Sequence, residues 1–343
     1  MSRHLHRGAP SSPPTLADVA LRAGVSRQTV SNALNNPDLL RADTLSRVRS
    51  AVAELGYTPN RAARNLRTRS SGLVGLRFAP AQEGTANATP DRFVHSLVET
   101  CRTAGLHVLL FAGDPADPLD GYDELIRSTA VDAFVITDTY LGNPQAAWLQ
   151  RRGVPFVAFG RPWDSTADHP WVDVDGAAGA RLATEHLLDR GHTRIGWIGW
   201  RKDSRIGEDR RAGWADALHA RGLPTTGLAS RVEDTVASGR EAAAVLLDEA
   251  QPSAFVCASD TLATGVLHTL ADRGMVAGRE VAVVGFDDSQ VAQVVPPGLT
   301  SVRQPLEQVA VEIVTGLQGL LAHPRVSRDG ILLAPTLVER GSS

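Results

Sequence analysis

The chain has 343 residues, of which 43% are hydrophobic and 21% are charged, and its formal net charge is −3. This length exceeds one average domain, so we expect two or three folded units with a sizeable core. The apolar runs are short, and none reaches the roughly 18–20 residues that span a bilayer. The N-terminal segment has no apolar stretch of signal-peptide length. The composition therefore excludes a membrane protein, and we expect the chain to stay in the cytoplasm.

Cysteine and histidine usage gives no sign of a metal or redox centre. Cys101 and Cys257 each lie in an apolar context, which favours buried free thiols over a disulfide. The ten histidines are scattered, and none is paired with cysteine or an acid at metal-ligand spacing. We therefore predict no metal site and no cofactor.

The charge is distributed unevenly along the chain. Residues 1–70 carry eleven arginines and four acidic residues, a net charge of +7, and the remainder carries −10. A basic head on an acidic body is typical of a phosphate-binding module fused to a second function.

The first elements form a helical head. Residues 1–14 are rich in Ser, Pro, Arg and His and are predicted to be a disordered tail. A first helix starts after Thr15 and is interrupted at Gly24, and Ser26 can cap a second helix that breaks at Asn35. A third helix is predicted near residues 42–55. Two short helices joined by a tight turn predict a helix-turn-helix, whose second helix lies in a major groove roughly 12 Å wide.

The start of the second helix offers side chains suited to base edges. We predict that Arg27, Gln28 and Asn32 read bases, because arginine pairs with guanine and Gln or Asn with adenine. Hydroxyls and helix amide ends suit phosphates better. The predicted backbone contacts are Thr15, Ser26, Thr29 and Ser31.

After about residue 72 the pattern changes to short apolar runs that alternate with helical stretches. Runs of this kind predict parallel α/β sheets covered on both faces, and their number favours two Rossmann-like lobes. The predicted strands are 73–76, 107–111, 133–136, 156–159, 194–198, 254–257 and 281–286.

The head resembles a known family nearly letter for letter in Thr15-Leu16-Ala17-Asp18-Val19-Ala20, Ala23-Gly24-Val25-Ser26 and Thr29-Val30-Ser31-Asn32-Ala33-Leu34-Asn35. These residues match the lactose/galactose-repressor (LacI/GalR) family of transcriptional regulators. The resemblance continues from Gly56 to Thr68, which in the family becomes a hinge helix on the operator. It implies that Asn60, Arg61 and Leu66 enter the minor groove, with Leu66 as a wedge that kinks the duplex. A plain basic linker is the alternative.

The body resembles the family's periplasmic-binding-protein-like core over essentially its whole length. The matching signatures are Val172–Gly176, Arg190–Gly196, Arg210–Trp214, Ala258–Asp260, Val284–Asp288, Leu299–Gln304 and Leu337–Arg340. The fold class that follows is an all-α helix-turn-helix head plus an α/β core of two Rossmann-like lobes. The expected boundaries are a tail (1–14), the DNA-binding domain (15–59), the hinge (60–70) and an effector-binding and dimerisation core (71–343). Lobe 1 is expected at 71–172 and 303–332, and lobe 2 at 173–302 and 333–343.

Ligands of such folds bind in the crevice outside the carboxyl ends of the strands. The resemblance implies that Arg210 and Asp287 contact the effector, and carboxylates, an arginine and aromatic walls suit a polyhydroxylated ligand. The remaining effector-binding candidates are Phe93, Thr137, Arg161, Trp163, Trp200, Asp234, Ser259, Asp260, Phe286 and Leu306. Each tryptophan has a core role as its alternative, and Asp260 has a helix cap.

Three positions depart from the family pattern. Ser259 replaces a common asparagine, Trp200 stands where a glycine is frequent, and Gly160-Arg161 occupies a position where some members place a ligand-binding aspartate. These departures make the identity of the effector hard to transfer. A mono- or oligosaccharide is the predicted ligand, with a nucleobase or nucleoside as the alternative.

The predicted function is a repressor of carbohydrate-utilisation genes that binds a pseudopalindromic double-stranded operator as a homodimer and is released by a sugar. A ligand that acts as corepressor is the alternative. A sugar-binding transport protein would lack the basic head. A sugar-converting enzyme would need a nucleophile or paired acids with an activating base, which are missing, so we predict no enzymatic activity.

Overall fold

The computed structural model describes residues 14–58, 70–78, 89–114, 116–137, 139–163, 168–323 and 330–343. Residues 1–13 of the predicted tail and the predicted hinge residues Asn60, Arg61 and Leu66 lie outside this set. The chain divides into two compact units, Met1–Ser71 and Gly72–Ser343, and each has its own hydrophobic core.

The N-terminal unit is a three-helix bundle of α1 (Leu16–Ala23), α2 (Arg27–Asn35) and α3 (Ala42–Leu55), with a 3-10 turn η1 (Pro37–Leu39) before α3. The hydroxyl of Thr15 caps α1 by accepting from the amide of Asp18, and Ser26 caps α2 by accepting from the amide of Thr29. Gly24 has a φ of 64°, in the left-handed region that glycine adopts without strain, and this lets the chain turn sharply into α2. The predicted helix-turn-helix is confirmed.

Small and branched side chains form the core of this unit. The fully or nearly fully buried ones are Val19, Ala20, Ala23, Val30, Ala33, Val48, Ala51 and Tyr57. Because Val30 and Ala33 of α2 face this core, the polar face of α2 is left at the surface.

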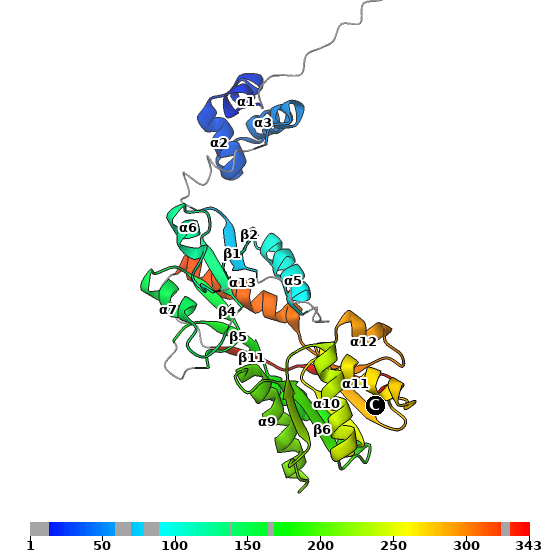
Figure 1. Ribbon diagram of the computed structural model, residues 1–343. Coiled ribbons are helices and arrows are strands. Elements are labelled where there is room, and N and C mark those ends of the chain that lie inside the picture. The colour runs from blue at the N-terminus through cyan, green and yellow to red at the C-terminus, as the bar shows by residue number, and fades with distance from the viewer. Residues whose placement is uncertain are drawn as a thin grey trace, which may run out of the picture. The chain divides into compact units, whose positions relative to one another are not determined.

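The second unit contains two six-stranded sheets, visible in Figure 1 as separate twisted layers flanked by helices. Lobe 1 has the strand order β11-β5-β4-β3-β1-β2, all parallel. Its strands are β1 (Leu73–Arg77), β2 (His107–Phe111), β3 (Ala133–Ile136), β4 (Phe156–Phe159), β5 (Trp171–Val174) and β11 (Ile331–Leu333). Its helices are α5 (Thr89–Thr103), α6 (Tyr122–Arg127), α7 (Pro144–Arg151) and α13 (Leu306–Ala322).

Lobe 2 has the strand order β12-β10-β9-β8-β6-β7, parallel except for the β10–β12 pair. Its strands are β6 (Ile195–Trp200), β7 (Ala229–Val232), β8 (Ala254–Cys257), β9 (Ala282–Phe286), β10 (Thr300–Arg303) and β12 (Thr336–Val338). Its helices are α8 (Gly176–Asp189), α9 (Arg205–Ala220), α10 (Val236–Glu249), α11 (Asp260–Asp272) and α12 (Gln290–Val294). The chain passes between the lobes three times, after β5, after β10 and after β11.

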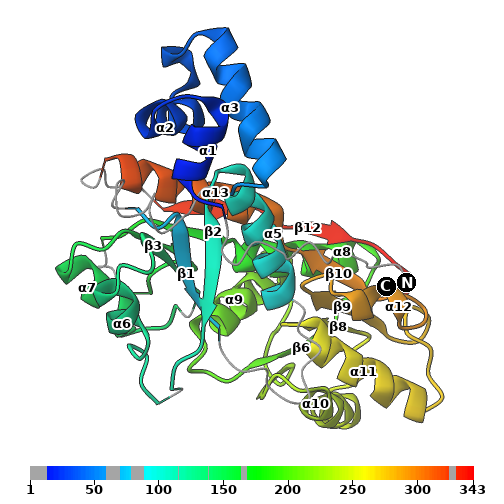
Figure 2. The ribbon, with the colours of Figure 1, turned by 90° about the horizontal axis from the view of Figure 1, so that it is seen from above.

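Both faces of each sheet are covered, as the continuous apolar strands predict. In β3, Val135 packs in the cluster with α5 and α13, whereas Phe134 and Ile136 pack in the cluster with α6 and α7 on the opposite face. Figure 2 shows helices on both sides of each sheet. The alternation explains why this strand is apolar at every position.

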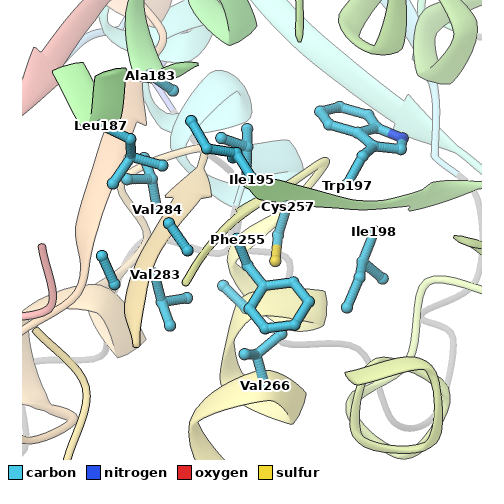
Figure 3. Close-up of a cluster of buried hydrophobic side chains, with 14 of the residues drawn as sticks. Ala183, Leu187, Ile195, Trp197, Ile198, Phe255, Cys257, Val266, Val283 and Val284 are labelled. Atoms are coloured by element: carbon cyan, nitrogen blue, oxygen red, sulfur yellow. The ribbon is translucent and has the colours of Figure 1, made fainter. Parts of the chain in front are cut away.

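The larger core lies in lobe 2, and part of it is drawn in Figure 3. Ile195, Trp197 and Ile198 from β6 meet Phe255 and Cys257 from β8 there. The Trp197 ring lies 6.1 Å from the ring of Trp214 on α9. This packing holds α9 against the end of β6, where the candidate effector residues lie.

The predicted two-lobed α/β core is confirmed, but the sequence pattern missed five strands. These are β5, β7, β10, β11 and β12. Each has only three or four residues, and all but β10 have no more than two buried positions. Short, partly exposed strands lack the continuous apolar run by which the other strands were predicted.

Candidate functional site

The exposed face of α2 carries the predicted base-reading residues. Arg27 and Gln28 are exposed and Asn32 is half-buried. The Nε2 of Gln28 donates to Oδ1 of Asn32 at 3.1 Å, so the two amides lie side by side one helical turn apart. Arg27 forms no ion pair within the described part of the chain, which leaves its guanidinium accessible to a base or phosphate.

The predicted phosphate-contacting hydroxyls are largely engaged within the head. Thr15 Oγ1 donates to Asp18 Oδ2 at 2.7 Å, and Ser26 Oγ lies 2.9 Å from Thr29 Oγ1. Ser31 accepts from the Asn35 amide through its backbone carbonyl. The backbone amides at the helix starts and the Ser31 hydroxyl are therefore the groups best placed to accept the predicted role of phosphate contact.

In the body, Arg210 on α9 is the centre of a buried polar cluster at the carboxyl ends of the lobe 2 strands. Its guanidinium carbon lies 3.6 Å from the ring centre of Phe286 and 4.9 Å from that of Trp200, so the group is held between two aromatic faces. Nη1 donates to the backbone carbonyl of Ala258 and lies 3.7 Å from Oδ1 of Asp287. Among the described residues, Nε has no hydrogen-bond partner.

The Asp287 carboxyl is buried beside this arginine. Its Oδ1 accepts from Nε2 of Gln304 at 2.7 Å. Burial raises the pKa of Asp287 to about 7, against the opposing effect of the Arg210 charge. Asp287 and Asp288 have φ angles of 107° and 47°, in the region that non-glycine residues rarely adopt. A strained backbone at the end of a strand is typical of a site held for binding.

Two further acids flank the cluster with different roles. Asp234 Oδ1 accepts from the hydroxyl of Ser259 at 2.5 Å. Ser259 also caps α11 through the amide of Leu262, so the helix-cap alternative considered for Asp260 is wrong. The carboxyl of Asp260 instead accepts from the amide of Ser289 and from the hydroxyl of Ser301. These bonds fix the loop after β9, which carries Asp287.

The lobe 1 candidates fall into an accessible group and a buried group. The guanidinium carbon of Arg161 lies 5.0 Å from the ring centre of Trp163, and both residues are partly exposed after β4. Thr137 is also partly exposed, after β3. Phe93 is buried, with its ring 4.6 Å from the ring of Phe159, and Leu306 is fully buried. These last two side chains lie in the hydrophobic core and not at the surface.

The structure adds polar residues that sequence reasoning did not single out. Gln304 holds Asp287, and Asp209 on α9 lies 3.0 Å from Arg161. Arg92 on α5 donates to the backbone carbonyl of Asp287 at 3.2 Å. Gln304 is the last residue of the signature segment Leu299–Gln304, and Asp209 directly precedes the segment Arg210–Trp214. Their position next to these segments was the one sign in the sequence that they belong to the site. Nothing in the sequence pattern marks Arg92.

The part of the chain that the structure describes contains no group of three or more His, Cys, Asp or Glu side chains that could hold a metal ion. It also contains no helix that is long and apolar enough to cross a membrane.

Comparison with known proteins assigns both units. Residues 15–60 match the family model described as bacterial regulatory proteins, lacI family, and residues 184–343 match a periplasmic binding protein-like domain. The chain is 35% identical over 310 residues to the HTH-type transcriptional regulator CelR of Thermobifida fusca, covering 88% of this chain and 89% of CelR. The chain belongs to the lacI family of bacterial regulatory proteins. It is therefore a helix-turn-helix transcriptional regulator, as the sequence predicted.

Solved structures of lacI-family regulators have the same fold. A complex of the transcriptional regulator CelR with cellobiose is 31% identical, covers 96% of this chain and all of that chain, and gives a TM-score of 0.73. A lac repressor dimer bound to operator and the anti-inducer ONPF is 28% identical, covers 96% of this chain and 99% of that chain, and gives a TM-score of 0.80.

The buried carboxyls of this lacI-family regulator predict a pH dependence of its stability. In the folded state the pKa of Asp287 is about 7, above the roughly 3.9 of an unfolded aspartate. The folded chain therefore holds a proton that the unfolded chain releases between these values. The contribution to the free energy of unfolding is fully present below the lower pKa, decreases as the pH rises to about 7, and stays constant above it. Asp260, whose pKa burial raises to about 6, adds a change of the same sign.

The variant Asp287→Asn removes this titration while keeping the shape of the side chain. Urea denaturation between pH 5 and pH 8 measures the free energy of unfolding of both proteins. We expect the wild-type value minus the variant value to fall as the pH rises from 5 to about 7 and to level off above it. Asp216→Asn, at an exposed position of α9, serves as the control. A difference that stays constant from pH 5 to pH 8 would contradict this account of Asp287.

Proposed function

We propose that this protein is a sequence-specific repressor of carbohydrate-utilisation genes that leaves its operator when a sugar binds the crevice of the body. The observation that carries the proposal is the Arg210 guanidinium between Trp200 and Phe286, 3.7 Å from the carboxyl of Asp287. Charged hydrogen-bonding groups beside aromatic faces match the hydroxyls and C–H faces of a sugar ring. The cellobiose complex of CelR and the operator complex of the lac repressor support the same assignment.

The head supplies the DNA contacts in this proposal. Arg27, Gln28 and Asn32 read base edges in the major groove, and their shared exposed face of α2 supports that role. Thr15, Ser26, Thr29 and Ser31 position the head on the phosphates. Hinge residues Asn60, Arg61 and Leu66, outside the described residues, contact the minor groove.

The effector contacts come from both lobes. From lobe 2, Arg210, Asp287 and Asp234 take ligand hydroxyls, with Trp200 as the aromatic wall. The buried Phe286 ring and Ser259 hydroxyl hold Arg210 and Asp234 in place. From lobe 1, Thr137, Arg161 and Trp163 complete the site. The buried side chains of Phe93, Asp260 and Leu306 support these residues from behind.

The working form in this proposal is a cytoplasmic homodimer without enzymatic activity or a cofactor. Two heads on a two-fold axis match a pseudopalindromic operator. Effector and operator affinities are then coupled reciprocally, typically by about 1–3 kcal/mol. The Ser259 hydroxyl, which lies beside the Asp234 carboxylate, is buried and caps α11 by accepting from the amide of Leu262, which supports a structural role for it rather than that of a nucleophile.

A thermal-shift screen of mono- and oligosaccharides and nucleosides on the full chain tests the proposed ligand class. We expect a neutral sugar, with cellobiose as the first probe, to raise the Tm in a concentration-dependent manner. Stabilisation by nucleosides alone would replace the sugar by the alternative ligand class. Conversion of the bound sugar to product would contradict a purely regulatory function.

A further inference from the structure

Two arginines of lobe 1 reach lobe 2 beside the candidate effector residues. Nη2 of Arg161, which follows β4, lies 3.0 Å from Oδ2 of Asp209 on α9. Nη1 of Arg92, on α5, donates to the backbone carbonyls of Asp287 at 3.2 Å and Asp288 at 3.4 Å. Both contacts join lobes that the chain itself connects only at its three crossings. The Arg161 contact is an ion pair with a carboxylate, whereas the Arg92 contacts are hydrogen bonds to backbone carbonyls.

The Arg161 guanidinium contacts one carboxylate in each lobe. Its Nε lies 2.7 Å from Oδ2 of Asp173 on β5, within lobe 1, and its Nη2 reaches Asp209 in lobe 2. Asp209 Oδ2 also accepts from the backbone amide of Ala177 at 3.1 Å, in the first turn of α8. Asp173 and Ala177 lie on either side of the first crossing between the lobes. The Arg161 bridge therefore spans that crossing.

The two carboxylates interact with Arg161 to different extents. Burial alone lowers the pKa of Arg161, but the hydrogen bond and charge of Asp173, followed by the charge of Asp209, raise it above its usual value. Burial raises the pKa of Asp209, and the charge of Arg161 reverses this only in part. Both carboxylates therefore stabilise the charged guanidinium. Asp173 has the larger effect, in agreement with its shorter distance.

The Arg161–Asp209 ion pair lies directly next to Arg210, the candidate effector contact. Asp209 precedes Arg210, and both side chains pack against Gly176 at the first crossing. A Cβ built on Gly176 would lie 3.0 Å from Cγ of Arg210 and 3.1 Å from Oδ2 of Asp209. This packing leaves little free space, so a shift of Asp209 relative to the crossing displaces Arg210 as well.

We propose that Arg161 and Asp209 are positioning residues that form a clamp between the lobes, setting the angle of the crevice and with it the place of Arg210. The role of the clamp in effector binding rests on the proposed function, but its effect on the angle between the lobes does not. Both side chains are about one-fifth exposed, so solvent screens the pair only partly.

The distance between the lobes can be measured directly in the full chain without ligand or DNA. Arg151→Cys at the end of α7 and Glu249→Cys at the end of α10 place one spin label on each lobe, at exposed positions. The native cysteines, Cys101 and Cys257, are fully buried and are not expected to react with the label. Electron–electron double resonance then gives the distance distribution, with an excess of unlabelled protein so that measured pairs lie within one chain.

In the Asp209→Asn variant the Ala177 amide keeps an oxygen acceptor, but the charge that faces Arg161 is lost. We expect a second population to appear at a different distance from the wild-type peak, in Asp209→Asn and equally in Arg161→Gln. The double variant should change the distribution no further than either single variant, because both remove the same contact. If one variant fails to fold by circular dichroism, the other decides the result.

Asp216→Asn is the matched control, because Asp216 lies on the same helix α9 but pairs with Arg181 on α8, within lobe 2. Its distance distribution should equal that of the wild type. The proposal is overturned if Asp209→Asn and Arg161→Gln both keep the wild-type distribution, or if Asp216→Asn changes it equally. Neither result bears on whether the crevice binds a sugar, which the thermal-shift screen decides separately.

Discussion

Replacing Arg210 with methionine is expected to weaken effector binding by at least about 100-fold while operator binding persists. Hydrogen bonds from a charged donor contribute about 1.5–3 kcal/mol each, and losing two of them gives a loss of this size. Methionine keeps an apolar chain between Trp200 and Phe286, so the variant isolates the charge from the packing. Loss of the cation also leaves Asp287 buried without its partner, which raises the pKa of that carboxyl further.

Isothermal titration calorimetry with a sugar found by the thermal-shift screen measures this effect. Arg201→Met is the control, because Arg201 follows β6 in the same lobe but is exposed and pairs with Glu233 at the surface. We expect the control to bind the sugar as the wild type does. An Arg210→Met variant that binds within about threefold of the wild type, a change below roughly 1 kcal/mol, would move the effector site away from Arg210.

Replacing Arg27 with alanine is expected to weaken operator binding by about 5- to 150-fold and to relax the preference at one base position. This range corresponds to the roughly 1–3 kcal/mol that a bidentate arginine–guanine contact contributes to discrimination. Arg27 is exposed at the first position of α2 and forms no ion pair within the described residues, so its loss disturbs no contact inside the head. Fluorescence anisotropy with operator DNA and with single-base variants measures both effects.

Arg49→Ala separates base reading from simple loss of charge. Arg49 lies on the exposed side of α3, so its loss should weaken binding to specific and random DNA by similar small factors. The assignment of Arg27 fails if Arg27→Ala behaves in the same way as Arg49→Ala.

The fold was predictable wherever the local pattern carried enough signal. Thr15, Gly24 and Ser26 mark the helix-turn-helix because a cap, a left-handed turn and a second cap have distinct residue preferences. Buried strands such as β8 and β9 were predicted from their apolar runs. Strand β7 was missed because none of its four residues is buried, and β11 and β12 pair only after long crossings of the chain. Pairing partners at such separations leave no local pattern.

The candidate site could be predicted less completely than the fold. Arg210, Phe286 and Asp287 lie in segments that match the family, and the structure brings them together around one guanidinium. Their contacts with an effector stay a prediction. Phe93 and Leu306 were predicted as apolar walls of the effector site, but the sequence did not show that both are buried in the core.

The cross-lobe contacts could not be predicted from the sequence. Arg92, Arg161 and Asp209 are ordinary charged residues of two helices and a loop, and their contacts depend on how the lobes pack at the crossings. Ion pairs between distant elements follow from tertiary geometry and have no spacing rule along the chain. The same reason explains why Asp260, at the start of α11, holds Ser289 and Ser301 instead of capping its own helix.

In the proposed function, one chain couples sequence-specific DNA binding to sugar binding. The most direct measurement is the affinity of the full chain for an operator selected from random DNA, by fluorescence anisotropy at fixed salt, with and without the stabilising sugar. We predict selection of a pseudopalindrome bound with a Kd of roughly 10⁻⁸ M or tighter, weakened about 5- to 150-fold by the sugar. Failure to enrich any sequence over random DNA, or an operator affinity that a saturating sugar leaves unchanged, would contradict it.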